Sequence, residues 1–385
     1  MITKTKTELI LASLIAAALA ILGLSQINRN ERIEKAKNES LQLNHKAFEG
    51  KDSKWISQHK RNLIEFLEKP RQLKGYLKWQ AKEFSSSTIN TSQHGYRLFD
   101  KCSQQWPPSD NKFNVFLVGA SRTFGLGVED SGTIGASLQR ALNEAEENTY
   151  CVYNMGQLGY MPEQELNEVM SIVNLGLKHR FAVISISGVN EGENPTSDSI
   201  DMPINRIQQS LNKGGSLSKH IGYKINKLTG TIKRRLNLQN NQAIESNGIT
   251  AKQREGTAEF SLKRFCNTAT AMATTTRANH GIFIKVLEPN PTWPKVSDAY
   301  SFKSKFNSNI KRKSDLFYDA INQRGCPNWE GQVNFINLSS LPQSKLPNAY
   351  ADWGHYSSRL NEDIGVIISK NLLEEAEGGH RRQQF

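Results

Sequence analysis

Short apolar runs that alternate with helical patterns limit the fold of this chain more than any other feature of its sequence. Parallel strands need a crossover between them, usually a helix, so strand and helix in alternation indicate a parallel sheet covered on both faces. The pattern predicts an α/β fold, a three-layer α/β/α sandwich with a mostly parallel sheet of about five strands. The expected strands cover residues 114–118, 150–153, 181–187, 282–287 and 333–336, and the expected helices cover about 133–147, 162–177, 259–279 and 359–373.

The first expected strand leads into a glycine-rich turn that carries a serine. The strand ends at Gly119, and Ser121 follows two residues later. A serine hydroxyl is a poor nucleophile unless a base removes its proton. Near the other end of the chain, Asp352 and His355 place a carboxylate and an imidazole three residues apart. His355 is therefore the candidate base, and Asp352 is the candidate group that orients it.

Two further strand ends carry groups that could donate hydrogen bonds to a negatively charged oxygen. Gly159 follows the second expected strand, and a glycine leaves its backbone N–H open to a ligand. Asn190 follows the third expected strand and offers a side-chain amide. Together with the backbone N–H of Ser121, these groups would supply three donors from the ends of three strands.

Four motifs stand in the order found in one enzyme superfamily. They are Gly119-Ala-Ser121, Gly159, Gly188-Val-Asn190-Glu191 and Asp352-Trp-Gly-His355. From about residue 94 to residue 373 the chain resembles the SGNH hydrolases, the GDSL-type esterases and lipases, and in particular their membrane-anchored bacterial members. The resemblance implies a flavodoxin-like sandwich and a catalytic triad of Ser121, Asp352 and His355. It also implies an oxyanion hole formed by Ser121, Gly159 and Asn190, and no cofactor.

The chain departs from the superfamily pattern at three places. Ala120 replaces the usual Asp of the Gly-Asp-Ser triplet, and Glu191 replaces the usual Asp after Asn190. Arg359-Leu-Asn stands where a glycine usually follows the histidine, so the final helix could start differently. The α/β-hydrolase fold is a poorer match, because the serine motif lacks the second glycine of G-x-S-x-G.

The residues and the resemblance together predict a serine esterase. It would cleave a carboxylic ester, such as an O-acyl group on an envelope glycan or a lipid, through an acyl-enzyme. An O-acyltransferase of cell-surface polysaccharide would use the same groups and stays open, because the acceptor is chosen by pocket walls that the sequence does not describe. A catalytically silent envelope binding or assembly protein is the third hypothesis. Loss of Ser121 or His355 would have been its sign, and both are present.

An apolar run at residues 9–24, broken only by Ser13, predicts a membrane segment. The run is long enough, with its flanks, to cross a thin bilayer as a tilted helix, and it also has the shape of a signal peptide. Its small residues at 16–18 lie mid-run rather than at its end, which favours an uncleaved anchor. Lys4 and Lys6 favour a cytoplasmic N-terminus, although basic residues also follow the run, at Arg29, Arg32, Lys35 and Lys37.

The expected protein is therefore single-pass, with its folded domain outside the cytoplasm, in the periplasm. The polar stretch at 85–92 marks the expected domain boundary. The predicted parts are a cytoplasmic N-terminus (1–7), a transmembrane signal anchor (8–27), a charged helical spacer (28–85), an SGNH hydrolase domain (86–375) with a basic insert (196–255), and a tail (376–385).

The basic character of the chain is concentrated in one segment. A formal net charge of +12 suits nucleic acid, anionic lipid or acidic polysaccharide, but no nucleic-acid-binding motif accompanies it. No acidic residue lies between Asp201 and Glu245, and the segment 206–235 carries basic residues among apolar ones at helical spacing. The pattern predicts an amphipathic basic helix that either covers the active-site edge or contacts an anionic surface. Nucleic acid is not an expected partner.

The remaining histidines and the cysteines give weaker indications. Without a carboxylate or cysteine at ligand spacing, the other histidines are expected at the surface or at helix ends, and no metal is expected. These histidines are His45, His59, His94, His179, His220, His280 and His380. An extracytoplasmic domain could pair its cysteines, whereas an apolar setting favours free buried thiols, so both states stay open for Cys102, Cys151, Cys266 and Cys326.

Overall fold

A five-stranded parallel sheet forms the centre of the protein, as the sequence predicts. The computed structural model describes residues 43, 45–69, 71–72, 74, 79–192, 251–290, 293, 308–327, 329–341, 348–352 and 354–382. The strand order is β4-β3-β5-β6-β7, and every neighbouring pair is parallel. The strands are β3 (Phe113–Gly119), β4 (Tyr150–Asn154), β5 (Phe181–Ser187), β6 (Ile282–Leu287) and β7 (Asn334–Asn337).

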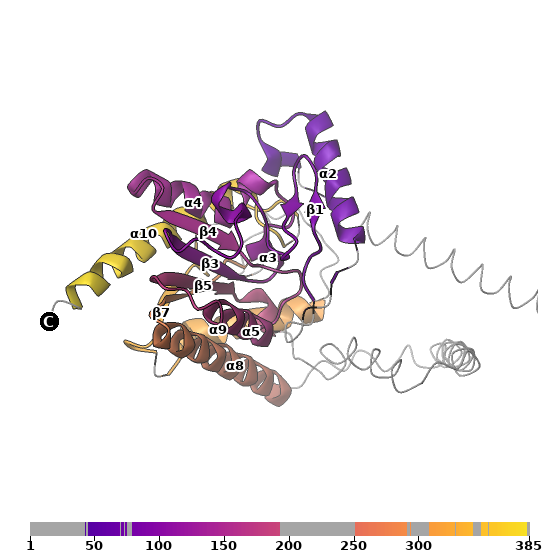
Figure 1. The fold of residues 1–385 in the computed structure, drawn as a ribbon. Coiled ribbons are helices and arrows are strands. Elements are labelled where there is room, and N and C mark those ends of the chain that lie inside the picture. Colours follow the sequence, from indigo (N-terminus) through magenta and orange to yellow (C-terminus); the bar gives the residue numbers. More distant parts are fainter. Residues whose placement is uncertain are drawn as a thin grey trace, which may run out of the picture.

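Helices cover both faces of this sheet and complete the three-layer sandwich (Figure 1). One face carries α4 (Ile134–Ala145) and α10 (Ser358–Arg382). The other face carries α5 (Pro162–Val173), α8 (Ala251–Ala278) and α9 (Ser308–Arg324). Along β3 the side chains alternate between these layers: Phe116 joins the core under α5, α8 and α9, and Val115 joins the core under α4 and α10. Both faces are buried, which is why most residues of the strands are apolar.

Several helix bounds differ from those expected. α5 ends at Val173, α8 begins at Ala251, and α10 continues to Arg382. The sequence reading missed α9 altogether, because the first half of this helix is strongly polar. Its apolar residues Phe317, Ala320 and Ile321 are nevertheless spaced as on one helical face, and all three are buried.

Residues expected to form a spacer and a linker instead pack on the domain. The helix α2 (Ser53–Glu68) and a short antiparallel hairpin of β1 (Phe84–Ser85) and β2 (Asn90–Thr91) form an additional layer, seen at the upper right of Figure 1. Apolar side chains of this layer join a core cluster with Phe124, Val128 and Ala351. We call α2 and the hairpin the N-terminal layer.

The hairpin shows why the polar stretch 85–92 is not a linker. Its polar groups satisfy one another: the Ser86 hydroxyl donates to the Ile89 carbonyl, and the Asn90 side chain accepts the N–H of Ser86. The Asn90 amide also donates to the carboxylate of Asp130, 2.6 Å away. Ile89 is buried in the middle of the turn. A serine-rich composition therefore hides a folded element.

The expectation that His59 lies at the surface or a helix end is wrong. This residue lies within α2 and is 0% exposed. Its Nε2 lies 3.1 Å from the Gly127 carbonyl, to which it can only donate, so Nδ1 accepts from the Thr88 hydroxyl at 3.0 Å. Burial lowers the pKa of His59, and the imidazole is neutral at pH 7. It joins α2 to the hairpin and to the turn after β3.

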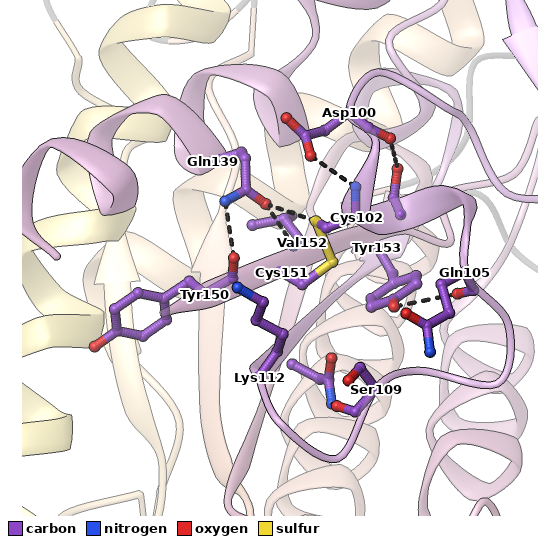
Figure 2. Close-up of a disulfide and its surroundings, with 12 residues drawn as sticks. Asp100, Cys102, Gln105, Ser109, Lys112, Gln139, Tyr150, Cys151, Val152 and Tyr153 are labelled. Carbon is purple, nitrogen blue, oxygen red and sulfur yellow. Dashed lines mark hydrogen bonds between the residues drawn. A yellow bond between two sulfur atoms is a disulfide. The ribbon is translucent and has the colours of Figure 1, made fainter. Parts of the chain in front are cut away.

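The four cysteines form two disulfides, Cys102–Cys151 and Cys266–Cys326. The first joins a 3₁₀ segment (Cys102–Gln104) to β4, and the second joins α8 to the chain after α9. Figure 2 shows the first bond beside Gln139, whose side chain accepts the N–H of Val152 and donates to the carbonyl of Tyr150. The structure therefore favours pairing over free thiols.

Two expectations fall on residues outside the described part of the chain. The anchor at 8–27 is one, and the basic segment 206–235 of the insert is the other. Within the described ranges, none of the helices combines the length and apolar character needed to cross a bilayer.

Other short 3₁₀ segments are His45–Phe48, Asp130–Gly132 and Val189–Gly192.

Candidate active site

The serine stands at the carboxyl end of the central strand β3. Gly119 closes the strand and α3 (Ser121–Phe124) begins directly afterwards. A side chain at Gly119 would overlap the Thr123 hydroxyl and the Ile186 carbonyl, so only glycine lets the chain pass this close to β5. The turn that presents Ser121 therefore depends on the glycine before it.

The structure brings Ser121, His355 and Asp352 together. The Oγ of Ser121 lies 3.0 Å from Nε2 of His355, and Nδ1 of the same ring lies 2.7 Å from Oδ2 of Asp352. Both distances allow hydrogen bonds. His355 and Ser121 are half-buried, whereas Asp352 is buried. The hydroxyl, the imidazole and the carboxylate are thus connected by two consecutive hydrogen bonds.

The surroundings of Asp352 keep it ionised. Its Oδ1 accepts the backbone N–H groups of Gly354 and His355, each at 2.8 Å. Burial alone would raise the pKa of Asp352, but the His355 imidazole and these two N–H donors lower it below its ordinary value. A carboxylate only accepts hydrogen bonds, so it favours the tautomer with the proton on Nδ1. In that tautomer Nε2 carries the lone pair that can accept the proton of Ser121.

A glycine also lies directly beside the base. A side chain at Gly127 would lie 3.2 Å from the Cβ of Ala351 and 3.5 Å from the Cβ of His355, and the φ of Gly127 is +99°. Another residue would be strained at this φ, and its Cβ would lie in tight contact with Ala351. The N–H of Ala351 donates to the carbonyl of His355 at 2.8 Å, which closes the loop.

Gly159 and Asn190 lie on the loops on either side of the serine. They follow β4 and β5, the two strands that flank β3. The Asn190 side chain donates to the Tyr160 carbonyl at 3.1 Å, which ties the second loop to the first next to Gly159. Gly159 is exposed, with a φ of +72° and open space around its Cα. Their roles as oxyanion donors stay predictions.

Sequence reasoning missed two charged residues behind the serine, Arg122 and Glu288. Both are buried, with 6% and 3% of their surfaces exposed, and they form an ion pair at 3.1 Å. Glu288 directly follows β6, so its place at a strand end was a usable signal. No feature of the sequence predicts that Glu288 contacts Arg122.

Glu191, which stands where the enzymes that the chain resembles have Asp, directly follows Asn190 and is fully buried. Its carboxylate accepts from the Ser187 hydroxyl at 3.1 Å and lies 3.5 Å from Arg264. Burial raises the pKa of Glu191 to about 7 against the opposing effect of Arg264. A second buried pair, Lys285 and Glu165, lies nearby with 3.6 Å between Nζ and Oε2.

In the described ranges no three His, Cys, Asp or Glu side chains cluster as metal ligands would.

Comparison with known proteins yields likeness in structure but not in sequence. No family model matches the chain, and no curated protein matches it. A member of the lipolytic protein G-D-S-L family from Veillonella parvula matches with a TM-score of 0.35 and 10% identity, over 68% of this chain and 97% of that one.

Two further solved structures match similarly. The lipase/acylhydrolase from Enterococcus faecalis has a TM-score of 0.37 and 14% identity, covering 68% of this chain and 95% of that one. The psychrotrophic esterase EstA from Pseudoalteromonas sp. has a TM-score of 0.33 and 10% identity, with 70% and 98% covered. All three scores lie below 0.5, so the function of this chain is inferred from its own residues.

Proposed function

We propose that the protein is a serine hydrolase that cleaves carboxylic esters through an acyl-enzyme. The observation that carries the proposal is the hydrogen-bonded chain from Ser121 Oγ through His355 to Asp352, at 3.0 and 2.7 Å. This chain meets the chemical requirement of a serine nucleophile, a base within reach of its proton, and a carboxylate that orients the base.

The proposed reaction begins when His355 Nε2 takes the proton of Ser121 while Oγ attacks the acyl carbonyl. Asp352 stabilises the imidazolium that forms, without taking the proton itself. His355 then gives the proton to the leaving alcohol, and the acyl group stays on Ser121. A water molecule, activated by the same imidazole, attacks the acyl-enzyme and releases the carboxylic acid.

The negative oxygen of the tetrahedral intermediate would be held by three donors. They are the backbone N–H groups of Ser121 and Gly159 and the side-chain amide of Asn190. Two observations support this choice: β4 and β5 flank β3, and Asn190 already contacts the carbonyl of Tyr160, the residue after Gly159. One Asn190 N–H is used in that contact, and an amide has a second to offer.

The proposed substrate is an O-acyl group on an envelope glycan, or another ester at the cell envelope. The apolar run at 9–24 would anchor the protein in the membrane. Two disulfides favour an oxidising compartment outside the cytoplasm. A reporter that is active only outside the cytoplasm, fused to residue 385, should therefore be active. A stable but silent fusion would mean the opposite orientation.

The catalytic proposal is tested on the full chain in detergent. A fluorophosphonate should label the wild type at Ser121, and short acyl esters should be hydrolysed. Ser121→Ala and His355→Ala should each reduce turnover to near background with unchanged circular dichroism. Ser171→Ala, on α5, is the matched control and should keep wild-type turnover. Wild-type turnover in Ser121→Ala on every ester tested would remove the proposal.

The same experiment includes a transferase arm. With a sugar acceptor present, a hydrolase releases the free acid, whereas an O-acyltransferase makes the acylated sugar at the expense of that acid. Both reactions need Ser121, so both should stop in the Ser121→Ala variant. A binding protein without catalytic activity would instead leave the ester intact in the wild type and in the variant.

A further inference from the structure

The buried ion pair behind the serine links the three loops of the candidate site. Arg122 directly follows Ser121, and its Nη1 lies 3.1 Å from Oε1 of Glu288. Burial alone would lower the pKa of Arg122, but Glu288 and the nearby tyrosines raise it above its ordinary value. Arg122 therefore stays charged within the protein, paired with a carboxylate.

A second contact of Arg122 reaches the loop that carries the base. Its Nε donates to the carbonyl of Gly354 at 2.5 Å. That carbonyl belongs to the peptide unit between Gly354 and His355, and the N–H of the same unit donates to Oδ1 of Asp352. Because a peptide unit is planar, fixing its carbonyl also fixes its N–H. Arg122 thereby orients the group that holds Asp352 against His355.

Glu288 extends the connection to the loop of Asn190. Its Oε1 accepts the backbone N–H of Val189 at 3.0 Å, next to Asn190 in the chain. Its Oε2 lies 3.3 Å from the hydroxyl of Tyr356, the residue after His355. Burial, followed by the nearby carboxylate of Glu288, raises the pKa of Tyr356 well above its ordinary value, so the hydroxyl keeps its single proton, which Oε2 shares with the carbonyl of Pro289 at 2.8 Å.

The geometry points to Arg122 and Glu288 as positioning residues that set the mutual placement of Ser121, His355 and the Asn190 loop. Neither side chain is accessible to a substrate, so the pair acts through its neighbours. A displacement of about 1 Å at reacting groups can reduce a rate about 10²-fold. This inference rests on the proposed hydrolase function, and it assigns a role in turnover rather than in substrate binding.

Buried ion pairs can also be purely structural, and a double substitution separates the two roles. Removing one partner leaves the other charge buried and uncompensated, whereas removing both often restores stability. Arg122→Met should therefore lower both the melting temperature and kcat. Arg122→Met/Glu288→Gln should recover much of the melting temperature, yet keep a kcat at least about 10²-fold below the wild type with KM within about threefold. The rate of fluorophosphonate labelling should fall in parallel.

Two further variants support the comparison. Arg122→Lys keeps a charge near Glu288 but cannot serve Gly354 and Glu288 in the same fork geometry, so its kcat should lie between those of the wild type and Arg122→Met. Leu142→Ala removes a fully buried side chain of α4 and lowers stability away from the site. It should keep wild-type kcat at temperatures where it is folded.

An activity-independent measurement distinguishes failure of this inference from failure of the proposed function. In protein with ¹⁵N-labelled histidine, the Nδ1–H resonance of His355 reports its hydrogen bond to Asp352. The resonance should shift in Arg122→Met/Glu288→Gln and stay unchanged in Leu142→Ala. An unshifted resonance, or a double variant whose kcat recovers with its melting temperature, would overturn the positioning role. A wild type that neither hydrolyses esters nor reacts with fluorophosphonate would refute the hydrolase proposal instead, whatever the resonance shows.

Discussion

Nε2 of His355 lies 3.0 Å from Oγ of Ser121, although 234 positions of sequence separate the two residues. β3 lies in the interior of the sheet, and Ser121, just after its carboxyl end, contacts His355 on the loop before α10. Two side chains that are distant in sequence are thus hydrogen-bonded to each other. The residues that surround them can be tested one at a time.

Replacing Asp352 by Asn should reduce kcat by roughly 10³–10⁴, since the amide can favour the wrong imidazole tautomer. The amide has one oxygen, so it cannot accept from the ring and from the two backbone N–H groups with separate oxygens, as the carboxylate does now. Asp352→Ala should cost less if a backbone carbonyl partly takes over the orienting role. Steady-state kinetics on a short acyl ester measure both, and equal turnover in wild type and Asp352→Asn would contradict the assignment.

Asn190→Ala should lower turnover by roughly 10²–10³, because one donor to the developing oxyanion is lost. KM should change little, since the charge appears only in the transition state. The control is Asn371→Ala on α10, whose side chain donates only to a carbonyl of its own helix. If both variants turn over equally fast, Asn190 is not an oxyanion donor.

The raised pKa of Glu191 predicts that the free energy of unfolding of the protein depends on pH. Its pKa is raised from 4.5 to about 7 by burial, so the folded protein retains a proton that the unfolded chain has released between these values. The unfolding free energy should therefore fall as pH rises through that window, by up to about 3 kcal/mol from this group. Below pH 4.5 and above about 7 this contribution should be constant.

The Glu191→Gln variant should show a flatter stability curve over the same window, with Glu165, Lys285 and Arg264 unchanged. Denaturant melts between pH 4 and 8 measure it. Glu374→Gln, an exposed substitution on α10, should keep the wild-type slope. An identical slope in Glu191→Gln and wild type would mean that Glu191 does not titrate there.

Removing the second disulfide with Cys266→Ser/Cys326→Ser should destabilise the protein by roughly 2–4 kcal/mol, since the bond closes a loop with a separation of 60 positions. Unfolding of the double variant and of the wild type, both without reductant, measures the effect. Alkylation of the denatured, unreduced wild type should modify none of the four cysteines, because all are paired. Labelling of Cys266 or Cys326 would show that this bond is absent.

The basic segment yields a prediction about surface binding. Changing Lys233, Arg234 and Arg235 to Gln should weaken binding to anionic liposomes or acidic glycan at low salt, and the difference should shrink as salt rises. Co-sedimentation with vesicles containing anionic lipid measures it, with neutral vesicles as the control. Unchanged binding would leave only a covering role for the segment.

The sheet was predictable because each strand contains a short, mostly apolar run, and most of these runs alternate with helical patterns. The candidate triad was predictable because Asp352 and His355 keep a short spacing and Ser121 follows a strand and a glycine. Arg122 and Glu288 could not be paired from sequence. Their contact depends on how the end of β6 faces the turn after β3, which is a property of the assembled sheet.

The N-terminal layer was misread for a different reason. The buried face of α2 includes His59 and Asn62 beside Ile56, Leu63 and Phe66, so its apolar stripe is interrupted by polar residues. Those residues are buried because the hairpin supplies their partners, including the Thr88 hydroxyl for both. A polar side chain can be buried when such hydrogen-bond partners are present, and the sequence alone does not show them.

Packing of the N-terminal layer sets where a truncated version of the protein can begin. Phe66 of α2 stacks on Phe124 with 5.2 Å between ring centroids, and Phe124 lies three residues after Ser121. A truncation starting at residue 86 would remove α2 and half of the hairpin, exposing Phe124, Val128 and Ala351 to water. Such a product should aggregate. A soluble enzyme for crystallisation should instead start before residue 43, after the apolar run.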